Sequence, residues 1–243
     1  MILDIYKDSF EYSAKDWKTL LILGAMAFFS FLLIPVFLIT GYNYRVTSIA
    51  VNGIINGRDP LPDFDDPISM FVDGIKYVIV EIAYLIVPIL LFIIFVLISV
   101  QFDGVVSTAL LIVGCLITFI VGIVASIMNL MGICHMAYHE GAFSKAFALR
   151  EIKDVISEIG WFECFTTYLG LVIITVTISL VVSTIIGLVF SVFGISGAML
   201  GADTTGVFIL GVIVNSLISM FLVGPYLSIF NSRSIGLLYT VQI

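Results

Sequence analysis

The chain has 243 residues, of which 61% are hydrophobic and only 11% are charged, and its formal net charge is −7. Soluble globular domains carry about 45–50% apolar and about 25% charged residues, so the composition excludes an ordinary water-soluble domain. The acidic balance argues against nucleic acid as a partner, because phosphate binding needs clustered Lys and Arg. We expect one all-α integral membrane domain over residues 1–243, with the lipid bilayer as its main partner.

Residues 1–16 mix charged and apolar side chains, and Ile2, Ile5 and Tyr6 recur at roughly helical spacing. A cleavable signal peptide would show a basic start followed by a short apolar region, and this segment does not. We predict a short amphipathic helix that lies on the membrane surface, with Trp17 as an interfacial anchor.

The apolar run from Trp17 to Gly41 permits two interpretations. A single span would place the N-terminal lysines outside, whereas a hairpin broken near Ser30–Pro35 keeps all ten basic residues on one side. The positive-inside rule therefore favours the hairpin. The returning helix would carry Arg45 close to mid-membrane, which costs several kcal/mol unless the charge is paired or hydrated. A shallow re-entrant hairpin would reduce that cost.

Four later runs are long enough to cross a bilayer core, which takes about 20 helical residues. They are Tyr77–Val100, Val105–Met128, Phe165–Phe193 and Gly206–Phe230. With the first hairpin they predict a helical bundle of six membrane segments, arranged as three sequential helical hairpins; a single first span would give five transmembrane helices. The loops near 103 and 203 lack Lys and Arg, so we expect them outside a plasma membrane and both termini in the cytoplasm.

Two connections, 57–76 and 139–163, are predicted to be cytoplasmic. In the first, Asp66 followed by Pro67 is typical of a helix N-cap and first helical position. In the second, the stretch 143–161 alternates apolar and charged residues near helical spacing, which predicts a short interfacial amphipathic helix.

Several strings in these segments carry a resemblance to a known family. They are Gly41-Tyr42-x-x-Arg45, Leu61-Pro62-x-Phe64-Asp65-Asp66, Phe71-Val72-Asp73-Gly74-x-Lys76 and Tyr138-x-Glu140-Gly141-x-Phe143. With them the chain resembles domain-of-unknown-function family 4013, an uncharacterised prokaryotic family of polytopic membrane proteins that is frequent in archaea. The resemblance implies an architecture and no established activity.

The loop motif supplies candidate site residues: Leu61, Pro62, Phe64, Asp65, Asp66 and Asp73. Its carboxylates could bind a hard cation through oxygen ligands. The regular ligand spacing and terminal bidentate Glu of an EF-hand are missing, however. We therefore predict capping and loop structure here, and no metal.

His135 and His139 lie four residues apart, so they share one helical face and could hold zinc. A zinc site would need a third ligand, and Glu140 follows the second histidine instead of lying inside the pair. We predict no metal, no cofactor and no catalytic site at this position.

Few polar residues interrupt the apolar runs, and the candidates are Arg45, Glu81, Asn129 and Asn215. Such residues usually face a bundle interior, where they form interhelical hydrogen bonds or line a solute path. An ion pair between Arg45 and Glu81 would neutralise both charges.

Small residues also recur every fourth position on two runs, where close approach of helix backbones would drive association in lipid. The two ladders are Ser179, Ser183, Gly187 and Ser191, and Gly211, Asn215 and Ser219. We expect them to pack within the bundle, and a homo-oligomer contact is the alternative.

No P-loop, dinucleotide fingerprint or nucleophile elbow is present in the sequence. The leading hypothesis is a non-enzymatic scaffold, a membrane-organising protein or a subunit of a membrane complex with other membrane proteins as partners. The alternative is a small-solute or lipid transporter with a polar path near Arg45, Glu81 and Asn215.

Overall fold

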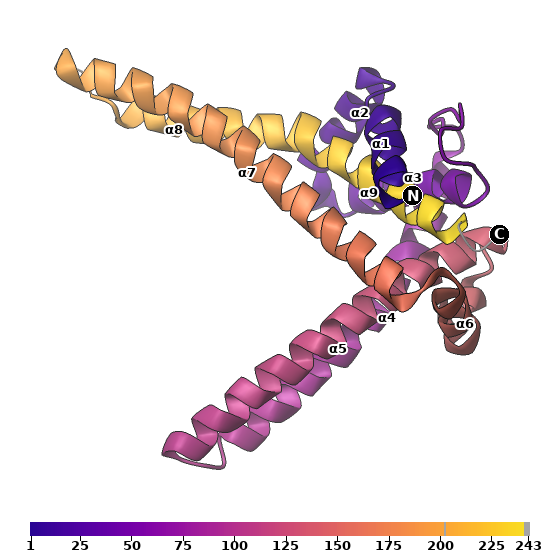
Figure 1. Ribbon diagram of the computed structural model, residues 1–243. Helices are drawn as coiled ribbons and strands as arrows, with labels where there is room; N and C mark the ends of the chain where they lie inside the picture. The colour runs from indigo at the N-terminus through magenta and orange to yellow at the C-terminus, as the bar shows by residue number, and fades with distance from the viewer. Residues whose placement is uncertain (202, 241–243) are drawn as a thin grey trace.

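The computed structural model describes residues 1–201 and 203–240, and over these residues the chain forms helices joined by short connections. The helices are α1 (Ile2–Ser13), α2 (Trp17–Phe28), α3 (Ile34–Val51), α4 (Pro67–Ser99), α5 (Gly104–Tyr138), α6 (Leu149–Ile159), α7 (Trp161–Met199), α8 (Thr205–Ile218) and α9 (Gly224–Tyr239). Short helical turns are η1 (Ser30–Leu32), η2 (Phe143–Phe147) and the π-helical η3 (Ser219–Val223). Two long arms, α4 with α5 and α7 with α8, diverge as a V from a compact head that contains both chain ends (Figure 1). The head consists of α1, α2, α3, α6 and α9, together with the ends of α4, α5 and α7 nearest to them.

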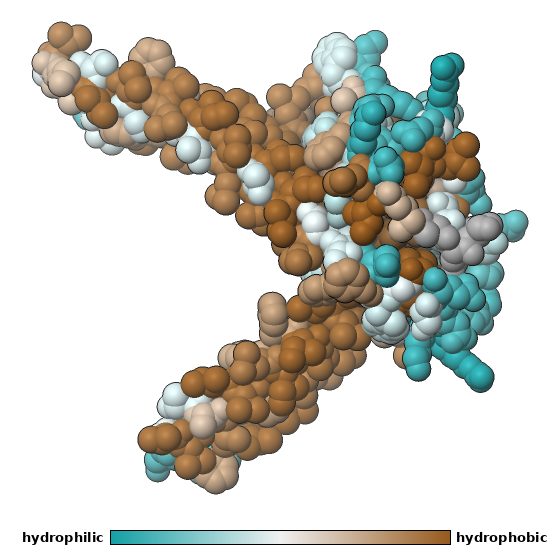
Figure 2. Space-filling model, in the orientation of Figure 1, coloured by the Kyte–Doolittle hydropathy of each residue, from teal (hydrophilic) through white to brown (hydrophobic). Residues whose placement is uncertain are grey.

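Four helices are long and apolar enough to cross a membrane: α4, α5, α7 and the continuous stretch Thr205–Tyr239, which joins α8, η3 and α9. They coincide with the four long runs expected from the sequence. At most 11% of the residues in their most apolar stretches are buried, so each arm leaves apolar side chains on its surface (Figure 2). Apolar surface of this extent is compatible with contact to lipid.

The first hairpin is present but does not reach a full crossing. The single-span interpretation of 17–56 is wrong in this structure, because α2 ends at Phe28 and the chain turns through η1 and Leu33 (φ +64°) into α3. With 12 residues, α2 measures about 18 Å, short of the about 30 Å hydrocarbon core. Gly24 meets Phe221 in η3, part-way along the last long helix. Among the described residues the structure thus has four helices long enough to cross a membrane, and the expected count of six membrane segments is not confirmed.

Two glycines bring α3 and α4 into backbone contact. A Cβ atom added to Gly41 would overlap the carbonyl oxygen of Met70, and one added to Gly74 would overlap the carbonyl oxygen of Phe37. The two contacts are reciprocal and one helical turn apart, so only residues without side chains fit at this crossing. The crossing fixes the first hairpin against the start of α4.

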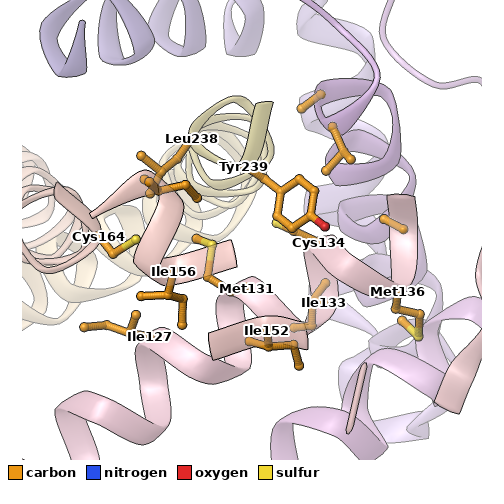
Figure 3. Close-up of a cluster of buried hydrophobic side chains, with 14 of the residues drawn as sticks. Ile127, Met131, Ile133, Cys134, Met136, Ile152, Ile156, Cys164, Leu238 and Tyr239 are labelled. Carbon is orange, nitrogen blue, oxygen red and sulfur yellow. The ribbon is translucent and has the colours of Figure 1, made fainter. Parts of the chain in front are cut away.

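Most of the buried apolar side chains lie in the head. Met131 from α5, Ile156 from α6, Cys164 from α7 and Leu238 from α9 converge there (Figure 3). The stretch 143–161 is divided into η2 and α6, and α6 turns its isoleucines inward. Helix packing at one end of the molecule therefore holds the two arms.

The amphipathic helix expected at the N-terminus forms as α1, and its apolar side is buried in the head, where α1 packs along α9. Protein therefore covers the side that was expected to face lipid. A buried ion network fixes this contact: Arg233, fully buried, binds Asp8 at 2.9 Å and Asp59 at 2.8 Å. The guanidinium also lies 4.5 Å from the ring centroid of Tyr12.

Candidate functional site

Two cavities open where the arms leave the head. The first, of about 550 Å³, lies between α4 and α5, and Tyr168 from α7 also lines it. Glu81 and Asn129, two of the polar residues singled out in the sequence, line it from opposite helices. In the described part of the chain nothing hydrogen-bonds Asn129 Oδ1 or Thr118 Oγ1. The cavity therefore combines a mostly apolar wall with polar residues from both helices.

The second cavity, of about 410 Å³, lies between α7 and α9, and Tyr168 borders it as well. Asn231 on α9 and Thr175 on α7 form a hydrogen bond across it at 3.4 Å, and Asn43 reaches it from α3. Sequence reasoning did not select these three residues as a set. Their convergence depends on how three helices far apart in sequence pack.

Arg45 does not meet Glu81. Its guanidinium instead donates hydrogen bonds to the carbonyl oxygens of Asp63 (3.3 Å), Asp65 (2.6 Å) and Asp66 (3.0 Å). The hypothesis of an Arg45–Glu81 pair is therefore wrong in this structure, since the guanidinium N–H groups of Arg45 donate to three backbone carbonyls of the loop instead. The energetic cost expected for a lone Arg45 charge near mid-membrane therefore does not arise, because α3 places the side chain beside this loop in the head.

The rest of the loop motif is structural as well. Phe64 stacks on Tyr42 with ring centroids 4.8 Å apart, and Leu61 packs with the same apolar cluster. Asp66 accepts a hydrogen bond from the Ser69 backbone N–H and so caps α4, as the sequence predicted. Asp65, next to Pro62, contributes its carbonyl to Arg45. Asp73 lies 3.8 Å from Lys76 one turn along α4, so the acidic residues of the motif face different partners.

Asn215 lies on α8 and contributes to neither cavity. Its neighbour in the ladder, Gly211, faces the Phe190 side chain of α7, so this ladder packs within the arm as expected. Around Gly187 in the other ladder, an added Cβ would meet nothing within 4 Å. The structure thus separates Arg45, Glu81 and Asn215 into three regions, and it does not join them in one polar path.

The two histidines meet a third residue that the sequence did not suggest. His135 Nε2 lies 2.9 Å from Glu151 Oε2, and His135 Nδ1 lies 2.7 Å from the hydroxyl of Tyr239. Lys145 also contacts Glu151 Oε2, at 2.7 Å. The hydrogen bonds from Lys145 and His135 lower the pKa of Glu151 to about 2, so it stays ionised. Glu140, the acid adjacent in sequence, is exposed and its backbone has φ +54°.

A comparison with models of known protein families found a match. A family model described as a protein of unknown function (DUF4013) matches residues 28–191, about two thirds of the chain. The chain belongs to this family. The DUF4013 match contains the glycine crossing of α3 and α4, the Arg45 loop and the histidine cluster up to α6, whereas α1 and α9 lie outside it. Searches of curated proteins and of solved structures found no match.

Proposed function

We propose that this DUF4013 protein is a non-enzymatic subunit of a membrane assembly, in which the head holds two splayed helical arms against other membrane helices. The observation that carries the proposal is the exposure of α7: in its most apolar stretch no residue is buried. Contact with lipid alone would suit such a helix. The small-residue ladder on the same helix, with open space at Gly187, is better suited to another helix backbone.

Charge supports a plasma-membrane orientation with the head in the cytoplasm. Every Lys and Arg belongs to helices or loops of the head, whereas the far loops carry Asp103 and Asp203. Cytoplasmic loops of membrane proteins are enriched in Lys and Arg. Both chain ends would then lie on the cytoplasmic side, since both are in the head (Figure 1).

The test is photo-crosslinking from α7 in native membranes. The exposed Cys115 is first replaced by Ala, which leaves the buried Cys134 and Cys164. A Gly187→Cys substitution is then labelled with a benzophenone maleimide and irradiated. We expect an adduct with a second copy of the chain or with another membrane protein, seen as a discrete heavier band.

Ile185→Cys is the matched control. Ile185 is 56% exposed and two residues away, which places it on nearly the opposite side of α7. We expect lipid adducts and no discrete protein band from this position. Equal protein crosslinking from both positions, or none from Gly187→Cys, would contradict the proposed contact.

A further inference from the structure

The histidine cluster at the junction of α5 and α6 has a feature that the assembly role does not use. His135 and His139 on α5 and Glu151 on α6 each offer one metal-ligand atom, and the three atoms lie within 4.8 Å of one another. Zinc bonds to histidine nitrogen at about 2.0–2.1 Å and to carboxylate oxygen at about 2.0–2.2 Å, so tetrahedral ligand atoms lie about 3.3 Å apart. Small rotations of the side chains would bring the three donors to that separation.

On each ring, the nitrogen that would not bind the metal already has an oxygen partner, as metal-bound histidines require. His139 Nδ1 lies 2.9 Å from the carbonyl oxygen of His135, which can only accept, so the proton is on Nδ1 and the lone pair on Nε2. His135 Nδ1 faces the Tyr239 hydroxyl at 2.7 Å. Metal-bound histidines almost always donate their second ring N–H to an oxygen in this way.

The proton balance of His135 is simple. While Nε2–H donates to Glu151, Nδ1 accepts from Tyr239; when Nε2 binds a metal, the ring proton is on Nδ1 and the Tyr239 oxygen accepts it. The imidazole stays neutral in both states. Lys145, which now contacts Glu151 Oε2, can keep the other carboxylate oxygen. The cluster is reached from the aqueous side of the head, because the Glu151 side chain is 49% exposed.

We infer that His135 Nε2, His139 Nε2 and a Glu151 carboxylate oxygen bind one divalent transition-metal ion, of which Zn²⁺ is the representative. Two imidazole nitrogens with one carboxylate oxygen are a ligand set that zinc uses in proteins and that other divalent transition metals share, and a water would complete a tetrahedral site. The ion would clamp α6 to the end of α5. Since Tyr239 orients His135, the clamp would extend to α9 and stiffen the base of both arms.

The experiment uses the full chain purified in detergent, stripped with a chelator and titrated with Zn²⁺ against a chromophoric competitor. We expect one tight site, and a rise in the unfolding temperature when Zn²⁺ is added. Tyr239→Phe should weaken binding by about 10–100-fold, as the loss of an outer-shell partner does. Glu151→Gln and His139→Ala should weaken it by more than that.

Glu140→Gln is the control, since it removes a neighbouring exposed carboxylate that does not face the histidines. It should keep the affinity and the thermal shift of the unaltered chain. Thermal unfolding of each variant in chelator shows whether the variant folds without metal. If Glu151→Gln does not fold, His139→Ala tests the site, because the Nδ1 contact that it removes is local, to the carbonyl oxygen of His135. Absence of a tight site, or a site of unchanged affinity in His139→Ala and Glu151→Gln, would overturn the inference.

Discussion

A single methyl group at Gly74 is expected to push α3 and α4 apart. The added Cβ would lie 2.7 Å from the Phe37 carbonyl carbon, whereas carbon atoms in contact are about 3.5–4.0 Å apart. The helices must therefore separate by about 1 Å. Overpacking costs about 1–3 kcal/mol, and because backbone cannot rotate away we expect about 3 kcal/mol. Alanine returns up to about 1 kcal/mol through helix propensity, which leaves a net loss of about 2 kcal/mol.

The reciprocal contact at Gly41 makes the reasoning sharper. Gly41→Ala should cost about as much, and the double variant should cost less than the sum, because helices already separated by one methyl accommodate the second. The assay is reversible unfolding in detergent, with Gly122→Ala as control, since its added Cβ would come no closer than 4.0 Å to Pro88. Two results would refute the close backbone contact at this crossing. One is a Gly74→Ala variant as stable as Gly122→Ala, and the other is a double variant whose loss of stability equals the sum of the two single losses.

Three further predictions concern the head. Arg233→Met should destabilise the chain by about 3–5 kcal/mol in the same unfolding assay, because it leaves the buried Asp8 unpaired; Asp8→Asn in that background should recover part of the loss. Arg45→Lys should speed proteolysis of the following loop, because one ammonium cannot replace a fork that reaches three carbonyls; unchanged cleavage would contradict this. Burial raises the pKa of Tyr12 above its usual value, so the stability it contributes is complete below pH about 10 and is lost as pH rises further. Tyr12→Phe should lack that alkaline loss when unfolding midpoints are compared from about pH 8 to about pH 11.

The candidate residues show where sequence reasoning stops. Asp66 could be recognised as a helix cap because its signal is local, an acidic residue directly before a proline and an apolar run. The contact between Glu151 and His135 could not be predicted, because η2 turns the chain back toward α5 before α6 begins. The spacing of residues in the sequence does not indicate that turn. Asp8 and Arg233, at opposite ends of the chain, are joined only by the packing of α1 along α9.

By itself the sequence determined that the chain is helical, with four helices long and apolar enough to cross a membrane. Backbone groups in lipid must be satisfied within the segment, so hydropathy and length are enough to define such helices. It also placed the basic residues together and allowed a hairpin between Trp17 and Gly41. Only the tertiary structure decided how deep that hairpin goes and what surrounds Arg45. Both depend on contacts of Gly24, Gly41 and the loop carbonyls with distant partners, and such contacts leave no periodic signal in the chain.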